Sequence, residues 1–447
     1  MKRKSLAVLL LLFALLVPST AFAEGYAVYE WSAAGSGMGE AYMFGENDPA
    51  VLAYNPAAIT RFEGAYASIG ASLFLPYINT KYSGYGPFNA NYGMGGSGSV
   101  ESVYSTATAP YLYYAQKAGK NSWWGIAEFS RFGNNVEYPS TWPGRYDTIF
   151  SGIKGFTVQP TYAWKMGSKW AAAVGLDINC VMLNLKAASP VMALKNPSDP
   201  RTLFHAGDAF SNVDGTSYSL GGVFSLMYDF DASTSAALVY HTAIKHNMAA
   251  DTDISSIIPA ANFSTTARGS VTLPDSFEFG LNHKFKDGKT RVEFDAIWTN
   301  WTTYDALDLT FDDPVGANPL TKQPIYSKNS IKNWNAAWRF NLGIEHKLSD
   351  QWSILGGYVY DQSPVPDDTM DFTVPTGDRH RLSIGFKYRP KENQEWSFAY
   401  TAIWPVERTV HSHLPEYYGL PSYDFNSATT CDGLTQVIGL GYTIKLK

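Results

Sequence analysis

The chain has only two cysteines and few charged residues for its length. Cys180 and Cys431 are too few for a disulfide scaffold and lack the spacing of a metal site. No segment after the N-terminus supplies the ~20 consecutive apolar residues of a transmembrane helix, which excludes a helical membrane protein. Charged residues make up 17% of the chain, below the ~25% usual in soluble domains. Basic residues do not outnumber acidic ones, so the sequence predicts no basic face for nucleic acid.

The N-terminus has the order of a secretory signal peptide. Three basic residues at positions 2–4 precede an apolar run from Leu6 to Val17, which is too short to span a bilayer, and Ala21-Phe22-Ala23 follows. We therefore expect residues 1–23 to be a signal peptide that is cleaved after Ala23. Removal of the three basic residues takes the net charge from −6 to about −9.

Aromatic residues are abundant where charge is scarce. They make up 15% of the chain, with 29 Tyr and 13 Trp. This surplus fits the aromatic girdles that membrane β-barrels carry at both interfaces. A large secreted β protein is the alternative that composition leaves open.

From about Ala65 onward, apolar and polar positions alternate in segments of roughly ten residues, which is the period of barrel strands. In the segment 170–182 the even positions are apolar and the odd positions are mostly small or polar. Half-buried strands of a soluble sandwich give the same pattern. Cys180 falls on the apolar face of this segment, so we do not expect a disulfide with Cys431.

The spacing between these segments predicts a barrel. Short polar links at 117–122, 166–169, 229–231, 286–289, 348–350 and 390–394 alternate with long connections at 83–99, 133–152, 187–215, 247–267, 311–334, 363–377 and 411–432. Short turns on one side and long loops on the other are typical of outer-membrane barrels. We predict an all-β fold, a transmembrane antiparallel β-barrel of about fourteen strands over residues 65–447 with long extracellular loops.

Residues 24–64 do not alternate like a strand and are rich in small residues between Ser32 and Gly39. A fourteen-stranded barrel is wider than the eight-stranded kind that side chains fill, so its lumen leaks unless something occupies it. We predict that residues 24–64 form an N-terminal hatch that plugs the lumen. A disordered periplasmic tail is the alternative, and aromatic residues such as Tyr26 and Trp31 argue against it.

Four motifs are spread over nearly all of the expected mature chain. They are Ser32-Ala33-Ala34-Gly35-Ser36-Gly37 with Asn55-Pro56-Ala57, then Trp142-Pro143-Gly144-Arg145-Tyr146, then Leu273-Pro274 before a strand, and finally Tyr360-Asp361-Gln362-Ser363-Pro364-Val365-Pro366 with Val374-Pro375 and Asp378-Arg379. In this order and spacing, they resemble the FadL/TodX family of outer-membrane transporters of long-chain fatty acids and hydrocarbons.

The resemblance implies passive uptake of long-chain fatty acids, with aromatic or alkane hydrocarbons as the alternative substrates. It also implies an external groove, an interior pocket, a moving hatch, and lateral exit through the barrel wall near a kinked third strand. The expected gating residues of the hatch are Asn55, Pro56, Ala57, Gly35 and Gly37, and the amide of Asn55 should fix a turn or bond the barrel wall. The expected lateral opening is at Ser130, Arg131, Phe132 and Gly133, where Arg131 and Gly133 interrupt the run of residues 123–129. The same interruption also fits the end of a strand.

Two further groups of residues are candidates for contact with substrate. Apolar residues on the expected loops could line an external groove or form a small core that caps the barrel; they are Leu194, Leu203, Phe204, Phe210, Ile257 and Phe263. Basic residues that could bind a carboxylate are Arg145, Arg339, Arg379 and Arg381. Pairing with internal carboxylates such as Asp361, Asp378 or Glu345 is the alternative role.

Nothing in the sequence points to catalysis. The eight histidines are scattered, and neither a GxSxG nor an HExxH motif occurs. We expect no enzyme activity, no catalytic residue, no cofactor and no metal. The expected partners are a long-chain fatty acid or another hydrophobic small molecule and the lipid of a Gram-negative outer membrane, with the protein as a monomer. An adhesin or a diffusion porin shares the barrel but does not explain the hatch. A barrel esterase, with Ser and His on neighbouring strands, is the remaining alternative.

Overall fold

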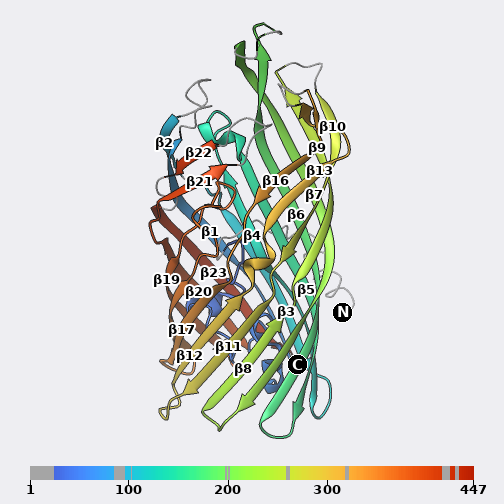
Figure 1. Cartoon of the computed structure of the whole chain (residues 1–447). Coiled ribbons are helices and arrows are strands. Elements are labelled where there is room, and N and C mark those ends of the chain that lie inside the picture. Colours follow the sequence, from blue (N-terminus) through green and yellow to red (C-terminus); the bar gives the residue numbers. More distant parts are fainter. Residues whose placement is uncertain are drawn as a thin grey trace.

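The alternating segments form a ring of antiparallel strands that closes on itself (Figure 1). The structure is a computed structural model that describes residues 25–446 except 85–95, 102, 197–198, 200–201, 258–261, 318–321, 415–422 and 428–431. The expected signal peptide and Cys431 lie outside these residues. No helix in the described part of the chain is long and apolar enough to cross a membrane.

Fourteen strands make the closed ring, which confirms the predicted number. In order around the wall they are β1 (Ala65–Gly84), β3 (Ala107–Lys117), β4 (Ser122–Glu137), β5 (Phe150–Met166), β6 (Trp170–Leu194), β7 (Leu203–Asp229), β8 (Thr234–His241), β11 (Ser276–Lys284), β12 (Thr290–Thr299), β17 (Ala337–Lys347), β18 (Trp352–Asp361), β19 (Arg379–Lys391), β20 (Gln394–Pro405) and β23 (Asp432–Leu446). Strand β23 pairs with β1 from Ala65↔Leu446 to Asn79↔Asp432, which closes the ring.

Further strands extend the wall above the ring, and two more form a separate sheet. They are β2 (Gly96–Val100), β9 (Ile244–Ser256), β10 (Phe263–Leu273), β13 (Ala306–Phe311), β16 (Ser327–Ile331), β21 (Val410–Leu414), β22 (Tyr423–Ser427) and the separate pair β14 (Gly316–Ala317) and β15 (Pro324–Ile325). Five short helices complete the described elements: α2 (Ala33–Gly37), α3 (Val51–Tyr54), η1 (Pro56–Arg61), η2 (Pro143–Tyr146) and η5 (Trp301–Thr303).

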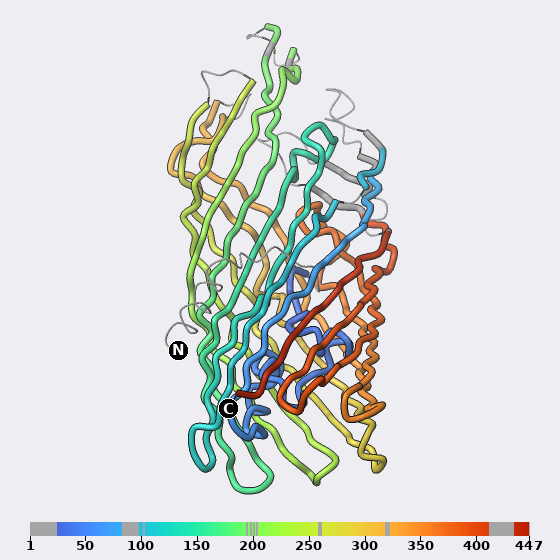
Figure 2. The backbone as a smooth tube through the Cα atoms, turned by 180° about the vertical axis from the view of Figure 1, so that it is seen from behind, coloured from blue at the N-terminus to red at the C-terminus, as the bar shows by residue number. Residues whose placement is uncertain are grey.

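The core of the molecule is the lumen, because the N-terminal residues lie inside the ring (Figures 1 and 2). The main cluster of buried apolar residues combines hatch side chains such as Tyr42 and Leu52 with wall side chains such as Phe129 and Ala163. Helices of four or five residues are not stable alone in water, so these elements depend on burial against the wall.

Two rings of aromatic side chains surround the outside of the barrel. The lower ring includes the pairs Trp170–Tyr228, Trp352–Tyr388 and Trp396–Tyr442, and the upper ring includes Tyr240–Phe277 and His380–Trp404. On β19, His380 and Tyr388 are eight residues apart, which is about 26 Å along the tilted strand. Apolar side chains between the rings point outward, including Leu382 and Ile384. The strand from His380 to Tyr388 thus has about the 9–11 residues with which a tilted barrel strand crosses the bilayer core.

The expected loops at 187–215 and 247–267 are wrong, because these segments continue as strands. Ala187 pairs with Ser211 in the β6–β7 hairpin, and Thr252 pairs with Thr265 in the β9–β10 hairpin. Their Pro, Gly and Asn residues suggested loops, but Pro190 and Gly207 sit beside a bulge that the hairpin accommodates. The long hairpin rises well above the ring (Figure 1).

Replacement of Ile384 by arginine tests the position of the belt. Ile384 is 65% exposed and lies midway between His380 and Tyr388. We expect Ile384→Arg to lower the free energy of unfolding by about 2–4 kcal/mol, measured by urea titration in lipid vesicles, because it places a charge at the bilayer midplane. Glu392→Arg in the exposed β19–β20 turn is the control and should change little. Equal effects would show that this belt does not face lipid.

Candidate functional site

The hatch fits the wall closely because glycines stand where the two touch. A Cβ added to Gly37 would lie 2.8 Å from the side chain of Leu355 and 3.3 Å from the backbone of Gly385. A Cβ on Gly35 would lie 2.3 Å from the hydroxyl of Tyr54. The two predicted glycines therefore let α2 pack against β18, β19 and the rest of the hatch.

The Asn55-Pro56-Ala57 motif joins the hatch to β7. Asn55 Nδ2 donates to the carbonyl of Met43 at 3.0 Å, and Ser225 Oγ donates to Asn55 Oδ1 at 2.6 Å. The backbone N–H of Ala57 donates to the same serine oxygen at 3.2 Å. Pro56 begins η1, where its fixed φ suits a first helical position. The amide of Asn55 thus bonds the wall, as expected, and also ties its own segment to the hatch loop at Met43.

A buried ion-pair cluster holds the N-terminal part of the hatch. Glu30 pairs with Arg381, and Arg381 also lies 2.7 Å from Asp361. Asp361 is shared with Arg339 at 3.2 Å, and the Arg339 guanidinium lies 4.3 Å from the ring centroid of Tyr29. All four charged side chains are at most 1% exposed, so each charge depends on its partners.

A second cluster holds the middle of the hatch. Arg291 pairs with Glu293 and lies 3.1 Å from Glu345. The N–H of Phe44 donates to Glu293 at 3.2 Å. The ring of Tyr42 lies 5.8 Å from Arg291 and 5.1 Å from Lys387. Hatch and wall therefore share one charge network.

Ion pairs also join the hatch to the periplasmic rim. Glu46 lies 2.5 Å from Lys284 and 3.3 Å from Lys347. Partial burial opposes ionisation of this carboxylate, but the two lysines outweigh it and lower the pKa of Glu46 to about 2. At the end of η1, Arg61 lies 2.5 Å from Asp229. The hatch is thus attached at its base as well as in the lumen.

The barrel wall is interrupted between β3 and β4. Their pairing runs from Lys117↔Trp123 only to Leu112↔Glu128, although both strands continue. On its other side β4 has a bulge, since its register with β5 shifts between Phe129 and Phe132. The predicted opening residues, Ser130 to Gly133, lie in and beside this bulge. They do not mark the end of a strand, because β4 continues to Glu137.

Residues of the hatch fill this interruption. The N–H of Val28 donates to the carbonyl of Arg131 at 2.7 Å, and the N–H of Gly133 donates to the carbonyl of Tyr26 at 2.7 Å. The indole of Trp31 donates to the carbonyl of Ser130 at 2.8 Å. Residues 26–28 therefore act as a short additional strand beside the bulge of β4, which supplies the backbone partners that β3 does not.

Tyr26, in this short strand, is enclosed by aromatic rings. Its ring centroid lies 4.6 Å from Trp301, 5.7 Å from both Tyr304 and Trp334, and 6.0 Å from Phe132. Trp301 belongs to η5, and Trp334 lies between β16 and β17. Rings from η5 and from the link between β16 and β17 therefore pack against the N-terminal segment. Trp301 and Trp334 were not singled out from the sequence, because no local pattern marks them, and Tyr26 was named only as evidence that residues 24–64 are ordered.

The interruption lies in the upper half of the apolar belt. Trp124 is 38% exposed and packs on Tyr114 at the short-turn end of the wall, with 5.2 Å between ring centroids. Pairing ends at Glu128, four residues farther up, which is about 13 Å along the strand. A molecule that passed here would enter the half of the membrane nearer the long hairpins.

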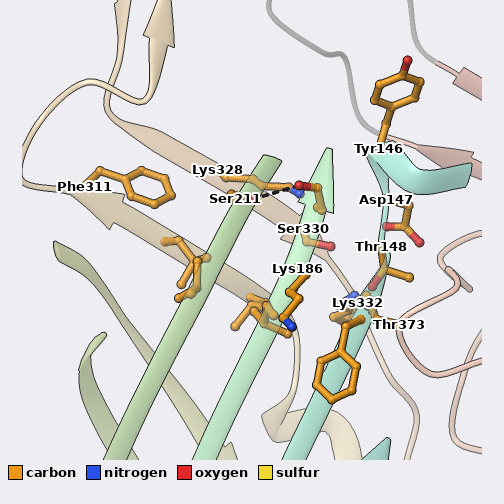
Figure 3. Close-up of a pocket in the computed structure, with 16 residues that line it drawn as sticks. Tyr146, Asp147, Thr148, Lys186, Ser211, Phe311, Lys328, Ser330, Lys332 and Thr373 are labelled. Atoms are coloured by element: carbon orange, nitrogen blue, oxygen red, sulfur yellow. Dashed lines mark hydrogen bonds between the residues drawn. The ribbon is translucent and has the colours of Figure 1, made fainter. Parts of the chain in front are cut away.

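A cavity of about 80 Å³ lies above the hatch, beneath η2 (Figure 3). Its apolar lining includes Phe150, Leu185, Val213, Leu307, Leu309 and Phe311, and its basic lining consists of Lys186, Lys328 and Lys332. Lys332 pairs with Asp371, and Lys186 lies 5.5 Å from the ring centroid of Phe150. Apolar walls with a few amines can hold an apolar chain that ends in an anion.

One carboxyl group of this cavity has an unusual pKa. Burial, and next the neighbouring Asp371 carboxylate, raise the pKa of Asp147 to about 7. The N–H of Phe372 donates to Asp147 at 2.8 Å. Near neutral pH this side chain therefore carries only part of a negative charge beside the three lysines.

The four candidate arginines lie in different surroundings. Arg339 and Arg381 belong to the ion-pair cluster of Glu30, and Arg145 pairs with Asp208 at 2.8 Å. Arg379 makes no ion pair with the described residues; its guanidinium donates to Thr376 Oγ1 beside a cavity of about 20 Å³. Three of the four thus have the structural pairing considered as the alternative.

The apolar groove residues are not brought together around the cavity beneath η2. Phe204 and Phe210 lie on β7, Phe263 begins β10, and Ile257 follows β9 with 53% exposure. The side chains of Leu194 and Leu203 lie outside the described residues. None of the other four lines the cavity beneath η2. The lysines there were missed, because single lysines in long connections give no pattern.

Comparisons with known proteins agree with this architecture. A family model described as outer membrane protein transport protein (OMPP1/FadL/TodX) matches residues 14–445. The long-chain fatty acid transport protein of Escherichia coli O157:H7 is 24% identical over 407 residues, covering 83% of this chain and 86% of the relative. Outer membrane protein P1 of Haemophilus influenzae is 24% identical over 401 residues, covering 82% and 83%.

Solved structures show the same fold. A Pseudomonas aeruginosa FadL homologue has a TM-score of 0.80 at 18% identity, covering 95% of this chain and 100% of that one. The Pseudomonas putida toluene transporter TodX has a TM-score of 0.64 at 14% identity, again covering 95% and 100%.

Replacement of Glu30 by glutamine tests how the hatch is held. The variant leaves Arg381 and Arg339 to share Asp361, so one buried positive charge loses its counter-charge. We expect the free energy of unfolding to fall by about 3–5 kcal/mol and ion conductance across planar bilayers to rise. Glu63→Gln is the control, because Glu63 makes an exposed ion pair with Lys117. Unchanged stability and conductance in Glu30→Gln would refute this role of the cluster.

Proposed function

Because the chain belongs to the OMPP1/FadL/TodX family of outer membrane transport proteins, we propose that it takes up long-chain fatty acids by passive, hatch-gated diffusion, as a monomer. The observation that carries this proposal is the interrupted wall at β4 and its closure by residues 26–28. The interruption is a route through the wall, and the short strand is a gate for it. We propose no catalytic role.

The cavity beneath η2 is the proposed site of capture. Its apolar residues would hold the hydrocarbon chain, and its lysines would hold the carboxylate. Aromatic or alkane hydrocarbons are the alternative substrates, since they need the same apolar walls. The three lysines favour a substrate with an anionic group, because a hydrocarbon has no charge or hydrogen-bond acceptor with which an ammonium group could interact.

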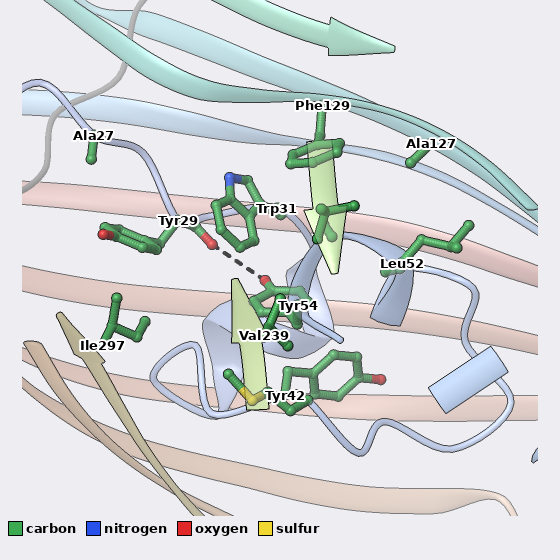
Figure 4. Packing of buried hydrophobic residues seen from close by; sticks show 14 of the residues in the cluster. Ala27, Tyr29, Trp31, Tyr42, Leu52, Tyr54, Ala127, Phe129, Val239 and Ile297 are labelled. Atoms are coloured by element: carbon green, nitrogen blue, oxygen red, sulfur yellow. Dashed lines mark hydrogen bonds between the residues drawn. The ribbon is translucent and has the colours of Figure 1, made fainter. Parts of the chain in front are cut away.

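The gate is proposed to be the N-terminal segment and not the whole hatch. The body of the hatch is tied to the wall by buried ion pairs, whose rupture is expensive. Apolar packing adds to them, as where Trp31 lies against Phe129 of the wall (Figure 4). Residues 26–28 are held by a few hydrogen bonds and by the rings around Tyr26. An incoming hydrocarbon chain can replace Tyr26 among those rings, which would release the segment from β4.

Lateral exit fits the energetics of the substrate. Each CH₂ group that moves from apolar surroundings to water costs about 0.8 kcal/mol, so a chain of fifteen methylenes would lose about 12 kcal/mol in an aqueous pore. A route from the cavity through the upper half of the belt keeps the chain in apolar surroundings. The substrate would therefore enter the membrane and not the periplasmic water.

A reversible cross-link tests this gate. Ala27 and Phe132 face each other as a non-hydrogen-bonded pair, flanked by the two bonds of residues 26–28 to β4, and such pairs bring Cα atoms to about 4.5 Å. In a background with Cys180→Ser and Cys431→Ser, Ala27→Cys with Phe132→Cys should form a disulfide. We expect fatty acid uptake into proteoliposomes to stop when it is oxidised and to return on reduction.

Each single-cysteine variant is the control and should transport under both conditions. Uptake that continued at the normal rate through the oxidised double variant would rule out residues 26–28 as the gate.

A pH series tests the site of capture. Asp147 is protonated below a pH of about 7 and ionised above it, so the cavity becomes less positive as the pH rises. We expect the affinity for a fatty acid to fall severalfold between pH 6 and pH 8, measured by tryptophan fluorescence titration. Asp147→Asn should remove this dependence, and a neutral hydrocarbon should bind equally at both pH values. A slope that Asp147→Asn left intact would argue against this cavity as the carboxylate site.

A further inference from the structure

The bulge of β4 places a buried arginine at the interruption of the wall. Arg131 is 5% exposed, and its own carbonyl accepts the hydrogen bond from Val28. Its side chain reaches Asp177 on β6, the strand beyond β5. The guanidinium therefore lies on the lumen side of the proposed exit.

Arg131 is poorly neutralised for a buried arginine. Among the described residues its guanidinium makes one hydrogen bond, a long contact of 3.4 Å from Nη1 to Asp177 Oδ2. Arg381 and Arg291 each contact two carboxylates. Because a guanidinium has five N–H donors, Arg131 keeps capacity for a further anion.

The surroundings of Arg131 limit how tightly an anion can bind. His241 Nδ1 lies 3.5 Å from Asp177, and His241 Nε2 lies 3.9 Å from Glu278. Two carboxylates and one guanidinium leave the cluster with a net negative charge when the histidine is neutral. Neither nitrogen of His241 nor Asp177 Oδ1 has a hydrogen-bond partner within the described structure. An anion at Arg131 would thus be held briefly, in competition with Asp177.

An exit through the wall requires such a site if the substrate is an acid. The hydrocarbon chain passes from apolar cavity to lipid at little cost, but an isolated carboxylate in an apolar medium is very unfavourable. A guanidinium beside the opening offsets this cost at the step where the head group crosses the wall.

We infer that Arg131 is a head-group transfer site, which binds the carboxylate of the substrate as it passes from the lumen to the interruption between β3 and β4. The inference rests on the proposed uptake function and extends it to the chemical class of the substrate, an apolar chain with an anionic end. Asp177 is the competing carboxylate that keeps the site from trapping the substrate.

Replacement of Arg131 tests the inference through the charge of the substrate. Uptake of hexadecanoic acid and of the uncharged hexadecanol is measured in proteoliposomes for the wild type, Arg131→Gln and Arg131→Lys. We expect Arg131→Gln to slow uptake of the acid about tenfold, the effect of a lost charge-assisted hydrogen bond, and to leave the alcohol within twofold. Arg131→Lys should retain most uptake of the acid. Arg268→Gln is the matched control, because Arg268 is 58% exposed and pairs with Asp312.

A second variant gives a change in the opposite direction. Asp177→Asn removes the competing carboxylate, so the acid should bind more tightly while binding of the alcohol stays the same. Equal slowing of acid and alcohol in Arg131→Gln, with no gain in acid affinity in Asp177→Asn, would show that Arg131 only supports the fold. A wild-type protein that takes up neither compound would instead overturn the proposed function, and the inference with it.

Discussion

A backbone amide or carbonyl inside a bilayer finds no water, so each one in a membrane wall must find a partner in the protein. In this barrel β3 and β4 stop pairing above Glu128, halfway up the apolar belt. The hatch supplies the missing partners through Tyr26, Val28 and Trp31. The continuity of the wall beside β4 therefore depends on these few hydrogen bonds.

The hatch is attached with two different strengths. Buried ion pairs such as Glu30–Arg381 and Arg291–Glu293 fix its body, since separating them would leave charges without partners in the lumen. The segment that closes the wall has no ion pair of its own among the described residues, and its main side-chain contact is an aromatic box around Tyr26. The body of the hatch is thus fixed mainly by buried charges, and its first residues by hydrogen bonds and ring contacts.

The barrel could be predicted from the sequence because lipid-facing and lumen-facing residues alternate along every strand. The interruption at Arg131 and Gly133 was visible in the sequence, but the sequence left open whether it marks a kink or the end of a strand, and the structure has a bulge there. The long hairpins were missed, because residues such as Pro190 and Gly207 suggest loops, while the pairing that keeps them extended comes from distant partners. The aromatic box and the lysines of the cavity depend on contacts between segments hundreds of residues apart, which no local pattern records. Arg339 and Arg381 pair with Asp361, which the sequence suggested as a partner, whereas Asp208, the partner of Arg145, lies on β7 and gave no local signal.

The hairpin of β6 and β7 reaches far beyond the girdles. Trp170 lies in the lower ring, so the strand crosses the upper ring near Ile178 and continues sixteen residues to Leu194, about 50 Å more along its length. Because its backbone is hydrogen-bonded along nearly all of this length, the hairpin is a stiff extension of the wall. Whatever approaches from outside meets its tip before it meets the mouth of the pore.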